Sequence, residues 1–427
     1  MKVLIISHTV FSRTNNMGRT LLSYFRDFSA GETAQFYIHS EIPTIDTVCK
    51  NYYRFTDKDA LRSVLRFKGK GKIYTAEDIG THEVQQRTDK GLTRAAYDIG
   101  SRRTGLIYVL RNLLWKFSHW ETAELKRWLK DFKPEIIFFA SGDYSFMYNI
   151  ARKIADELAI PLVTCCVDDF YLFNANHDSL LGRIEHALRM KTVHRTMARS
   201  SCILTISDAM GTAYEKLFQR PCFTIDTSAE NKELSFPAQA QDISYIGNLG
   251  LNRHLQLIEI GRELKKRGLK LDVYSTETSR ALLEGMNCEN GICFHGALPA
   301  DEVLRVMERS MLLIHTEAFD EKSLNRVRFS VSTKIAETLM YGPCMLAYGP
   351  EEAASISYLK QNDAAYVITS REKLGDGLDE LLANAGLRHT IVQNARKLAK
   401  VRHSTAENTA KLRCWLQDAI DHYGDKP

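Results

Sequence analysis

Short apolar runs alternate with helical patterns along most of the chain, and the alternation restarts after residue 241. The first series contains predicted strands at 3–6, 134–140, 161–167 and 202–207. The second contains predicted strands at 243–246, 271–274, 293–296, 311–315, 344–347 and 366–368. Such alternation is typical of parallel sheets covered by helices. The sequence therefore predicts an α/β fold with two Rossmann-like, doubly wound domains.

A polar connector, residues 227–241, separates the two series. We expect an N-terminal domain at 1–230, a second domain at 241–405, and a C-terminal helix at 406–427 that packs back on the first domain. Doubly wound domains bind ligands at the carboxyl ends of their strands. The sequence thus predicts a ligand site in a cleft between the two domains.

Composition excludes several classes of protein. A net charge of +5 is too small to argue for a nucleic-acid partner. The nine cysteines form no C-x-x-C pair and have no metal-ligand spacing, which favours reduced thiols and predicts no metal site. The N-terminus enters a strand directly, and no apolar run reaches the roughly 18 residues that span a bilayer. We therefore expect a cytoplasmic protein.

Residues 49–120 interrupt the regular pattern, and basic residues outnumber acidic ones there by fifteen to seven. The apolar stretch 105–116 has basic flanks, and Trp115 and Trp120 lie in or near it. We expect an irregular basic insertion, for which two interpretations stay open. Residues 100–120 could touch an anionic membrane surface, placing the protein on the inner face of the membrane. Alternatively, the stretch is a core-facing helix behind a solvated basic loop.

A loop of small hydroxyl residues becomes a helix at Ser332-Thr333-Lys334. Helix N-termini present unpaired N–H groups and a positive dipole end, so this turn could hold phosphate. Ser332 and Thr333 could cap the helix and donate hydrogen bonds, and Lys334 adds positive charge. Glu337, one turn further, could accept from a ribose hydroxyl. A purely structural capped helix start is the alternative.

Several motifs between residues 244 and 408 occur in an order that resembles the GT-B glycosyltransferases, specifically the retaining group 1, or family 4, enzymes. The motifs are Tyr245-Ile246-Gly247-Asn248, Phe294-His295-Gly296, Ser332 to Glu337 with Gly342, Ala347-Tyr348-Gly349-Pro350, and His403-Ser404-x-x-Glu407-Asn408. In this family the second domain binds the diphosphate of a nucleotide-sugar. The first domain supplies most contacts to the acceptor.

The resemblance implies roles for residues that match the family motifs. The implied donor-binding residues are Gly18, Gly247, Asn248, Gly250, Arg253, His295, Ser332, Thr333, Lys334 and Glu337. Glycines let a turn approach the diphosphate closely. Alternatives stay open: Arg253 as an exposed helix residue, His295 as a hydrogen-bonded strand end, and Gly18 as a plain helix-start glycine.

The implied chemistry is displacement at an anomeric carbon, with negative charge growing on the leaving diphosphate. Without metal, cationic side chains and helix N–H groups would stabilise that charge, and the candidates are Arg253, Lys334, Arg326 and Arg328. The only Asp-x-Asp triplet, Asp57-Lys58-Asp59, is interpreted as a cap for a helix starting near Ala60.

Two positions depart from the family pattern. Phe329 stands where the family often has the first glutamate of Glu-x7-Glu, and Glu317 or Asp320, slightly upstream, could substitute for it. Asp168 and Asp169 follow a strand where many family members have a histidine. A carboxylate there could serve as a base or accept from a sugar hydroxyl, or it could be a turn cap. The candidate catalytic residues are therefore Asp168, Asp169 and Glu317.

The resemblance implies a metal-independent, retaining glycosyltransferase with a nucleotide-sugar as co-substrate and no other cofactor. Its acceptor would be a glycan, a polysaccharide or a lipid-linked sugar, which suggests a role in polysaccharide biosynthesis. Two alternatives remain. One is a non-catalytic sugar-nucleotide-binding subunit of the same fold, and the other is a nucleotide-sugar 2-epimerase.

Overall fold

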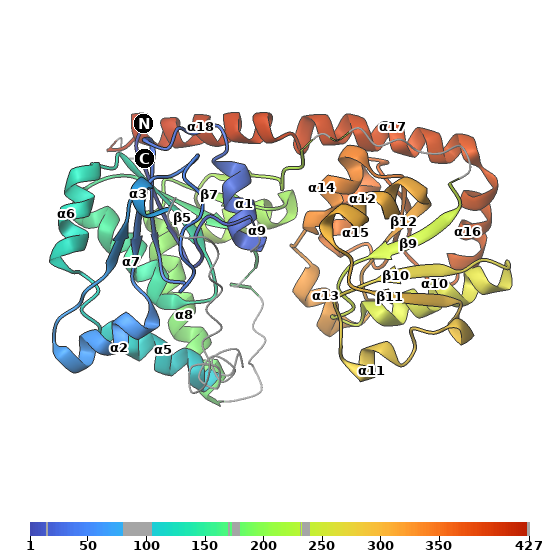
Figure 1. The fold of residues 1–427 in the computed structure, drawn as a ribbon, viewed down its shortest axis with the longest axis horizontal. Helices are drawn as coiled ribbons and strands as arrows, with labels where there is room; N and C mark the ends of the chain where they lie inside the picture. Colours follow the sequence, from blue (N-terminus) through green and yellow to red (C-terminus); the bar gives the residue numbers. More distant parts are fainter. Residues whose placement is uncertain are drawn as a thin grey trace. The chain divides into compact units, whose positions relative to one another are not determined.

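A computed structural model describes residues 1–13, 16–79, 105–169, 171–172, 180–230, 232 and 240–424. The chain divides into two compact units (Figure 1). Unit 1 comprises Met1–Ile225 and Thr409–Pro427, and unit 2 comprises Asp226–Asn408. Residues 226–230 and 406–408, which the sequence assigned elsewhere, thus belong to unit 2.

Unit 1 contains an eight-stranded sheet in the order β4-β3-β2-β1-β5-β6-β7-β8. Neighbouring strands are parallel except β3 and β4, which are antiparallel. The strands are β1 (Val3–Ser7), β2 (Thr33–Tyr37), β3 (Asn51–Arg54), β4 (Lys72–Tyr74), β5 (Ile136–Ser141), β6 (Leu162–Cys166), β7 (Cys202–Thr205) and β8 (Cys222–Thr224).

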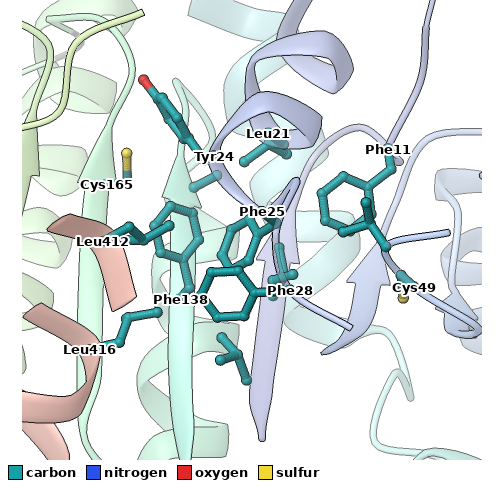
Figure 2. Packing of buried hydrophobic residues seen from close by; sticks show 14 of the residues in the cluster. Phe11, Leu21, Tyr24, Phe25, Phe28, Cys49, Phe138, Cys165, Leu412 and Leu416 are labelled. Carbon is teal, nitrogen blue, oxygen red and sulfur yellow. The ribbon is translucent and has the colours of Figure 1, made fainter. Parts of the chain in front are cut away.

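Helices cover this sheet. They are α1 (Asn16–Tyr24), α2 (Asp57–Arg66), α3 (Ala76–Ile79), α5 (Gly105–Phe117), α6 (Ala123–Phe132), α7 (Ser145–Leu158), α8 (Leu180–Arg199) and α9 (Asp208–Phe218). The C-terminal helix α18 (Thr405–Asp421) returns to unit 1, where its Leu412 and Leu416 are fully buried. Figure 2 shows these leucines near Phe138, whose ring meets Phe25 edge-on at 5.0 Å.

The prediction of an irregular insertion at 49–120 is wrong for the described part of that segment. Residues 49–79 and 105–120 contain β3, α2, β4, α3 and α5, and the two strands extend the sheet. The strands are only four and three residues long, so they carry no extended apolar run. Residues 80–104 lie outside the described residues.

The cap of α2 also differs from its prediction. The helix begins at Asp57 rather than near Ala60, and Thr56 is the N-cap. The Thr56 side chain accepts from Asp59 N, and Asp59 accepts from Thr56 N at 2.9 Å, which completes a capping box. Asp57 instead accepts from Trp115 Nε1 at 2.7 Å.

Helix α5 supports the core-facing interpretation on one of its sides. Trp115 is buried and its ring stacks on Phe146 with centroids 4.4 Å apart, and Trp120 is also buried. Neither tryptophan is therefore available as a membrane anchor. Among the described residues, no helix is both long and apolar enough to cross a bilayer.

Unit 2 contains a six-stranded parallel sheet in the order β11-β10-β9-β12-β13-β14. The strands are β9 (Asp242–Ile246), β10 (Leu271–Tyr274), β11 (Ile292–Gly296), β12 (Ser310–Thr316), β13 (Cys344–Tyr348) and β14 (Tyr366–Ile368). All six predicted strands of the second series are present. The apolar pattern is clearest in β9, β10, β12 and β13, which have buried centres.

The helices of unit 2 are α10 (Arg253–Lys266), α11 (Arg280–Leu283), α12 (Ala300–Arg309), α13 (Glu321–Val327), α14 (Thr333–Tyr341), α15 (Ala354–Gln361), α16 (Leu374–Ala383) and α17 (Ala385–Arg402), with a 3₁₀ turn η1 (Cys288–Asn290). Helix α14 ends at Tyr341, and Gly342 is its C-cap residue. Arg396 of α17 donates to the carbonyl oxygens of Thr338, Leu339 and Gly342 at this end. These bonds supply acceptor partners at the helix C-terminus, where carbonyls lack intrahelical donors.

Candidate functional site

The turn that follows β9 is held by its own side chains. Tyr245 Oη donates to the carbonyl oxygen of Asn248 at 2.6 Å, and Gly250 N donates to Asn248 Oδ1 at 2.6 Å. A Cβ at Gly247 would lie 2.5 Å from Tyr245 Oη. Glycine is thus needed at 247 to accommodate Tyr245, whether or not a ligand also approaches.

The loop before α14 ends at Ser332, which is the N-cap residue, and the helix begins at Thr333 as predicted. The prediction that the Ser332 side chain caps the helix is wrong, because it makes no capping hydrogen bond. The Ser332 backbone N–H instead donates to Ser355 Oγ at 3.0 Å. Ser355 therefore fixes the loop, and capping by the Ser332 hydroxyl is not needed to shape it.

Lys334 joins these two segments. Its Nζ donates to the carbonyl oxygen of Ile246, the last residue of β9, at 2.9 Å. Although the residue as a whole is exposed, loss of water around the ammonium group lowers the Lys334 pKa. The Arg253 charge lowers this pKa further, while Glu337 opposes the shift. The β9–α10 turn and the start of α14 thus place two cations and one carboxylate in one electrostatic neighbourhood.

Arg253, the first residue of α10, is held by a buried carboxylate. Its Nε and Nη2 donate to the two oxygens of Glu317 at 2.9 and 3.1 Å, a bidentate arrangement. Glu317 follows β12 and is 1% exposed, and burial raises its pKa against the opposing effect of Arg253. Because both oxygens face Arg253, the geometry favours Glu317 as a positioning residue for that cation. Its predicted catalytic role stays a prediction.

His315 is a member of this cluster that sequence reasoning missed. It lies two residues before Glu317, near the end of β12, and its Nε2 is 3.6 Å from Glu317 Oε1. Within the part of the chain that the structure describes, Nε2 has no hydrogen-bond partner. Burial, together with Arg253 and Lys334, lowers the His315 pKa to about 3. A histidine ending a strand beside a candidate carboxylate was the available sequence signal.

The depressed His315 pKa makes the stability of the protein depend on pH. The unfolded chain takes up a proton at His315 near pH 6.5, whereas the folded chain does so only near pH 3. The neutral imidazole therefore stabilises the fold fully above pH 6.5, and this contribution falls as the pH drops toward 3. Between pH 6.5 and 5 the expected loss is about 2 kcal/mol.

Urea unfolding of wild type and His315→Asn at pH 7.5 and 5.0 measures this contribution. The difference in unfolding free energy between the two pH values should be about 2 kcal/mol smaller in the variant. An exposed histidine replaced in the same way, His389→Asn on α17, serves as the control and should change the difference little. An equal pH dependence of wild type and His315→Asn would contradict the assignment.

His295 lies at the end of β11, an edge strand, and fits the hydrogen-bonded alternative. Its Nε2 lies 2.7 Å from Asp272 Oδ1, and its ring stacks on Tyr274 with centroids 4.6 Å apart. The side chain is still 40% exposed. Arg326 and Arg328 are exposed near the end of α13.

The candidates in unit 1 have local structural roles. A Cβ at Gly18, within α1, would lie 2.6 Å from the carbonyl oxygen of Val10, so close packing alone requires glycine there. Asp169 Oδ1 accepts from Tyr171 N, Leu172 N and, at 2.8 Å, Tyr214 Oη. Asp169 therefore forms the turn cap that was the alternative interpretation. Asp168 Oδ1 accepts from Asp169 N at 2.9 Å.

A second polar cluster lies at the carboxyl ends of β1 and β5, and sequence reasoning missed it. Tyr108 Oη donates to Asp143 Oδ2 at 2.5 Å, and the His8 ring stacks on Tyr144 with centroids 5.3 Å apart. Burial and the charge of Arg111 lower the His8 pKa to about 4. These side chains occupy the end of a parallel sheet where doubly wound folds place ligands. Asp143, directly after a predicted strand, was the available signal.

Within the described residues, no three His, Cys, Asp or Glu side chains come together in an arrangement that could hold a metal ion.

Known proteins resemble this chain in one segment and in its complete fold. Residues 255–413 match a family model described as glycosyl transferase-like, which starts two residues after Arg253. HepE of Anabaena, solved with UDP-glucose, is 12% identical with a TM-score of 0.62, covering 98% of this chain and 100% of that one. The fold is GT-B. The predicted GT-B fold is confirmed, and the glycosyl transferase-like match over residues 255–413 agrees with the predicted activity.

Two further solved structures share the GT-B fold with this chain. Sucrose-phosphate synthase of Thermosynechococcus elongatus is 9% identical with a TM-score of 0.61, covering 99% of this chain and 100% of that one. Trehalose 6-phosphate synthase of Burkholderia multivorans is 11% identical with a TM-score of 0.61, covering 98% and 97%. No curated protein matches the chain.

Proposed function

We propose that this GT-B glycosyltransferase takes a sugar from a nucleoside-diphosphate-sugar whose diphosphate binds in unit 2, at the β9–α10 turn and the start of α14. The observation that carries the proposal is the bond between Lys334 Nζ and the carbonyl oxygen of Ile246, which brings these two segments together beside Arg253. HepE, a protein of the same fold, has been solved with UDP and with UDP-glucose, which supports a nucleotide-sugar as donor.

The unit 2 cluster is suited to a diphosphate for electrostatic reasons. The Arg253 guanidinium is oriented by Glu317, and the Lys334 ammonium has lost part of its water, so neither group must reorganise much to meet an anion. Amides in the first turn of α14 add hydrogen-bond donors and the positive end of a helix dipole. Glu337, one turn along α14, would accept from the ribose.

The transfer step follows from this placement. As the bond between the anomeric carbon and the diphosphate breaks, the electron pair leaves with the diphosphate, and Arg253 and Lys334 stabilise the added charge. The acceptor hydroxyl forms the new bond to the anomeric carbon, and its proton passes to the departing diphosphate. These cations could stabilise the leaving group without a metal. We also propose that the configuration at the anomeric carbon is retained, because the sequence resembles retaining enzymes.

The acceptor and the cellular location are inferred from the sequence resemblance and from the basic, apolar stretch near residue 110. We propose a glycan, polysaccharide or lipid-linked acceptor, in polysaccharide biosynthesis, and a cytoplasmic protein that contacts the inner face of the membrane through residues 100–120. Exposed leucines on α5 support the contact, whereas the buried Trp115 takes no part in it.

A thermal-shift panel of nucleotide-sugars with different bases and sugars tests the proposed function. A ligand at a hundred times its dissociation constant should add about 2.7 kcal/mol of stability. The stabilising compound, radiolabelled in its sugar, should then transfer label to an acceptor glycan. Stabilisation without transfer would favour a non-catalytic subunit, conversion of the donor without any acceptor would favour a 2-epimerase, and no stabilisation by any compound would contradict donor binding.

A further inference from the structure

Helix α5 has a second apolar side, opposite the buried one. Tyr108 and Trp115 are buried, whereas the other side carries four large apolar residues that are 44% to 61% exposed: Leu106, Leu110, Leu113 and Phe117. Their spacing of four, three and four residues places them in one stripe along the helix. A helix that only covered a sheet would have polar residues on this side.

Helix α8 repeats this arrangement. Leu180, Ile184 and Leu188 recur every four residues and are 47% to 68% exposed, while Glu185 and Arg189 are buried on the other side. Helix α2 adds Leu61 and Leu65, and Phe67, just beyond its end, is 82% exposed. Helix α5 packs against both α2 and α8, and Figure 1 shows all three at the same end of unit 1.

These ten residues form what we call the apolar face: Leu61, Leu65, Phe67, Leu106, Leu110, Leu113, Phe117, Leu180, Ile184 and Leu188. Single exposed leucines are ordinary on soluble proteins, but a gathering of this kind on three packed helices marks an interaction surface.

Charge on the same helices indicates what the apolar face binds. Helices α2, α5 and α8 contain ten Lys and Arg residues against three Asp and Glu residues, although the whole chain has a net charge of only +5. All three acidic residues are engaged. Asp57 pairs with Arg111, Asp59 closes the capping box of α2, and Glu185 is buried beside Arg189. The charge presented to solvent around the apolar face is therefore positive.

Apolar stripes bordered by exposed cations match the interface of an anionic bilayer. Leucine and phenylalanine side chains enter the boundary between head groups and acyl chains, while arginine and lysine meet anionic head groups. Arg62, Lys116 and Arg183 are exposed on the three helices, and none forms an ion pair within the described parts of the chain.

We propose that the apolar face on α2, α5 and α8 docks unit 1 onto a membrane containing anionic lipid. The purpose of this docking rests on the proposed function: it would hold the enzyme close to a lipid-linked or membrane-near acceptor. It extends the contact beyond residues 100–120 to two further helices. The inserting side chains are leucines, an isoleucine and two phenylalanines, and the tryptophans take no part.

Sedimentation with vesicles tests the proposal. The full-length protein should bind vesicles of equal parts phosphatidylcholine and phosphatidylglycerol at least about tenfold more tightly than vesicles of phosphatidylcholine alone. Leu110→Ser/Phe117→Ser should weaken binding to the anionic vesicles by about tenfold or more. Arg62→Gln and Arg183→Gln should each weaken it about fivefold, and salt should weaken it in all forms.

The matched control is Leu217→Ser/Leu269→Ser, which changes two leucines that are each 38% exposed and lie outside the three helices. It should bind vesicles like wild type. Unfolding temperatures and nucleotide-sugar binding should be unchanged in both double variants, so a loss of docking can be told apart from a loss of the proposed donor site.

Two results would overturn the proposal. One is a wild-type protein that ignores anionic vesicles. The other is a protein that forms dimers in gel filtration which Leu110→Ser/Phe117→Ser converts to monomers, because the apolar face would then join two copies of the chain. Vesicle binding without any nucleotide-sugar binding would support membrane docking by the apolar face and contradict the proposed donor site.

Discussion

Replacing Arg253 with methionine should lower kcat/KM for glycosyl transfer by roughly 10²–10³-fold. The guanidinium is the group best placed to stabilise charge on the leaving diphosphate, and removing one such preorganised donor has effects of this size. The measurement is initial rates with the donor identified by thermal shift. The same substitution leaves the Glu317 carboxylate buried without its bidentate partner, so it should also destabilise the fold by about 3–5 kcal/mol.

A second substitution separates the two effects. In Arg253→Met/Glu317→Leu the unpaired buried charge is gone, so unfolding free energy should return close to the wild-type value. Transfer should stay as impaired as in Arg253→Met, because the cation is still missing. Recovery of activity together with stability would show that Arg253 acts only as a structural partner of Glu317. A single Glu317→Gln variant should keep most of its donor affinity if Glu317 only orients Arg253.

Lys334→Met should weaken binding of the nucleoside diphosphate by roughly 10- to 100-fold. A hydrogen bond from a charged donor contributes about 1.5–3 kcal/mol, and each 1.4 kcal/mol is a factor of ten in affinity. Titration calorimetry with the diphosphate and the monophosphate of the same nucleoside measures the effect. The monophosphate should be affected less, because it offers fewer oxygens to the cations.

The control for Lys334 is Lys266→Met, since Lys266 is 67% exposed at the other end of α10. It should leave both affinities unchanged. Equal weakening by the two lysine substitutions would indicate only a long-range effect of net charge, and the assignment of Lys334 to the diphosphate would be wrong.

The strands that the sequence predicted are those with continuous apolar centres. Strand β2 was missed because Thr33 and Gln35 interrupt its apolar residues, yet both are fully buried. Gln35 can be buried because its Nε2 donates to Ser7 Oγ and its Oε1 accepts from Phe11 N. Phe11 is 24 residues and Ser7 is 28 residues away from Gln35 in the chain, so no local sequence pattern predicts these hydrogen bonds.

The sequence predicted the separate segments of the candidate site, but it did not predict the ion pair between Arg253 and Glu317. The helix start at Thr333 and the turn at Gly247 follow from local chemistry. The pairing of Arg253 with Glu317 depends on β9 and β12 being neighbours in the sheet, since 64 residues separate the two side chains. Strand order decides which strand ends meet, and periodicity carries no information about that order. The same argument explains why His8 and Asp143, at the ends of adjacent β1 and β5, were missed.

Diphosphate recognition by unit 2 is tested most directly by titrating the full-length protein with UDP and UMP, or with the corresponding pair of whichever base the thermal-shift panel selects. Wild type should bind the diphosphate at least about tenfold more tightly than the monophosphate. Arg253→Met/Glu317→Leu should fold stably and lose most of that preference. A stable double variant that binds the diphosphate as tightly as wild type, with the same preference over the monophosphate, would contradict the account.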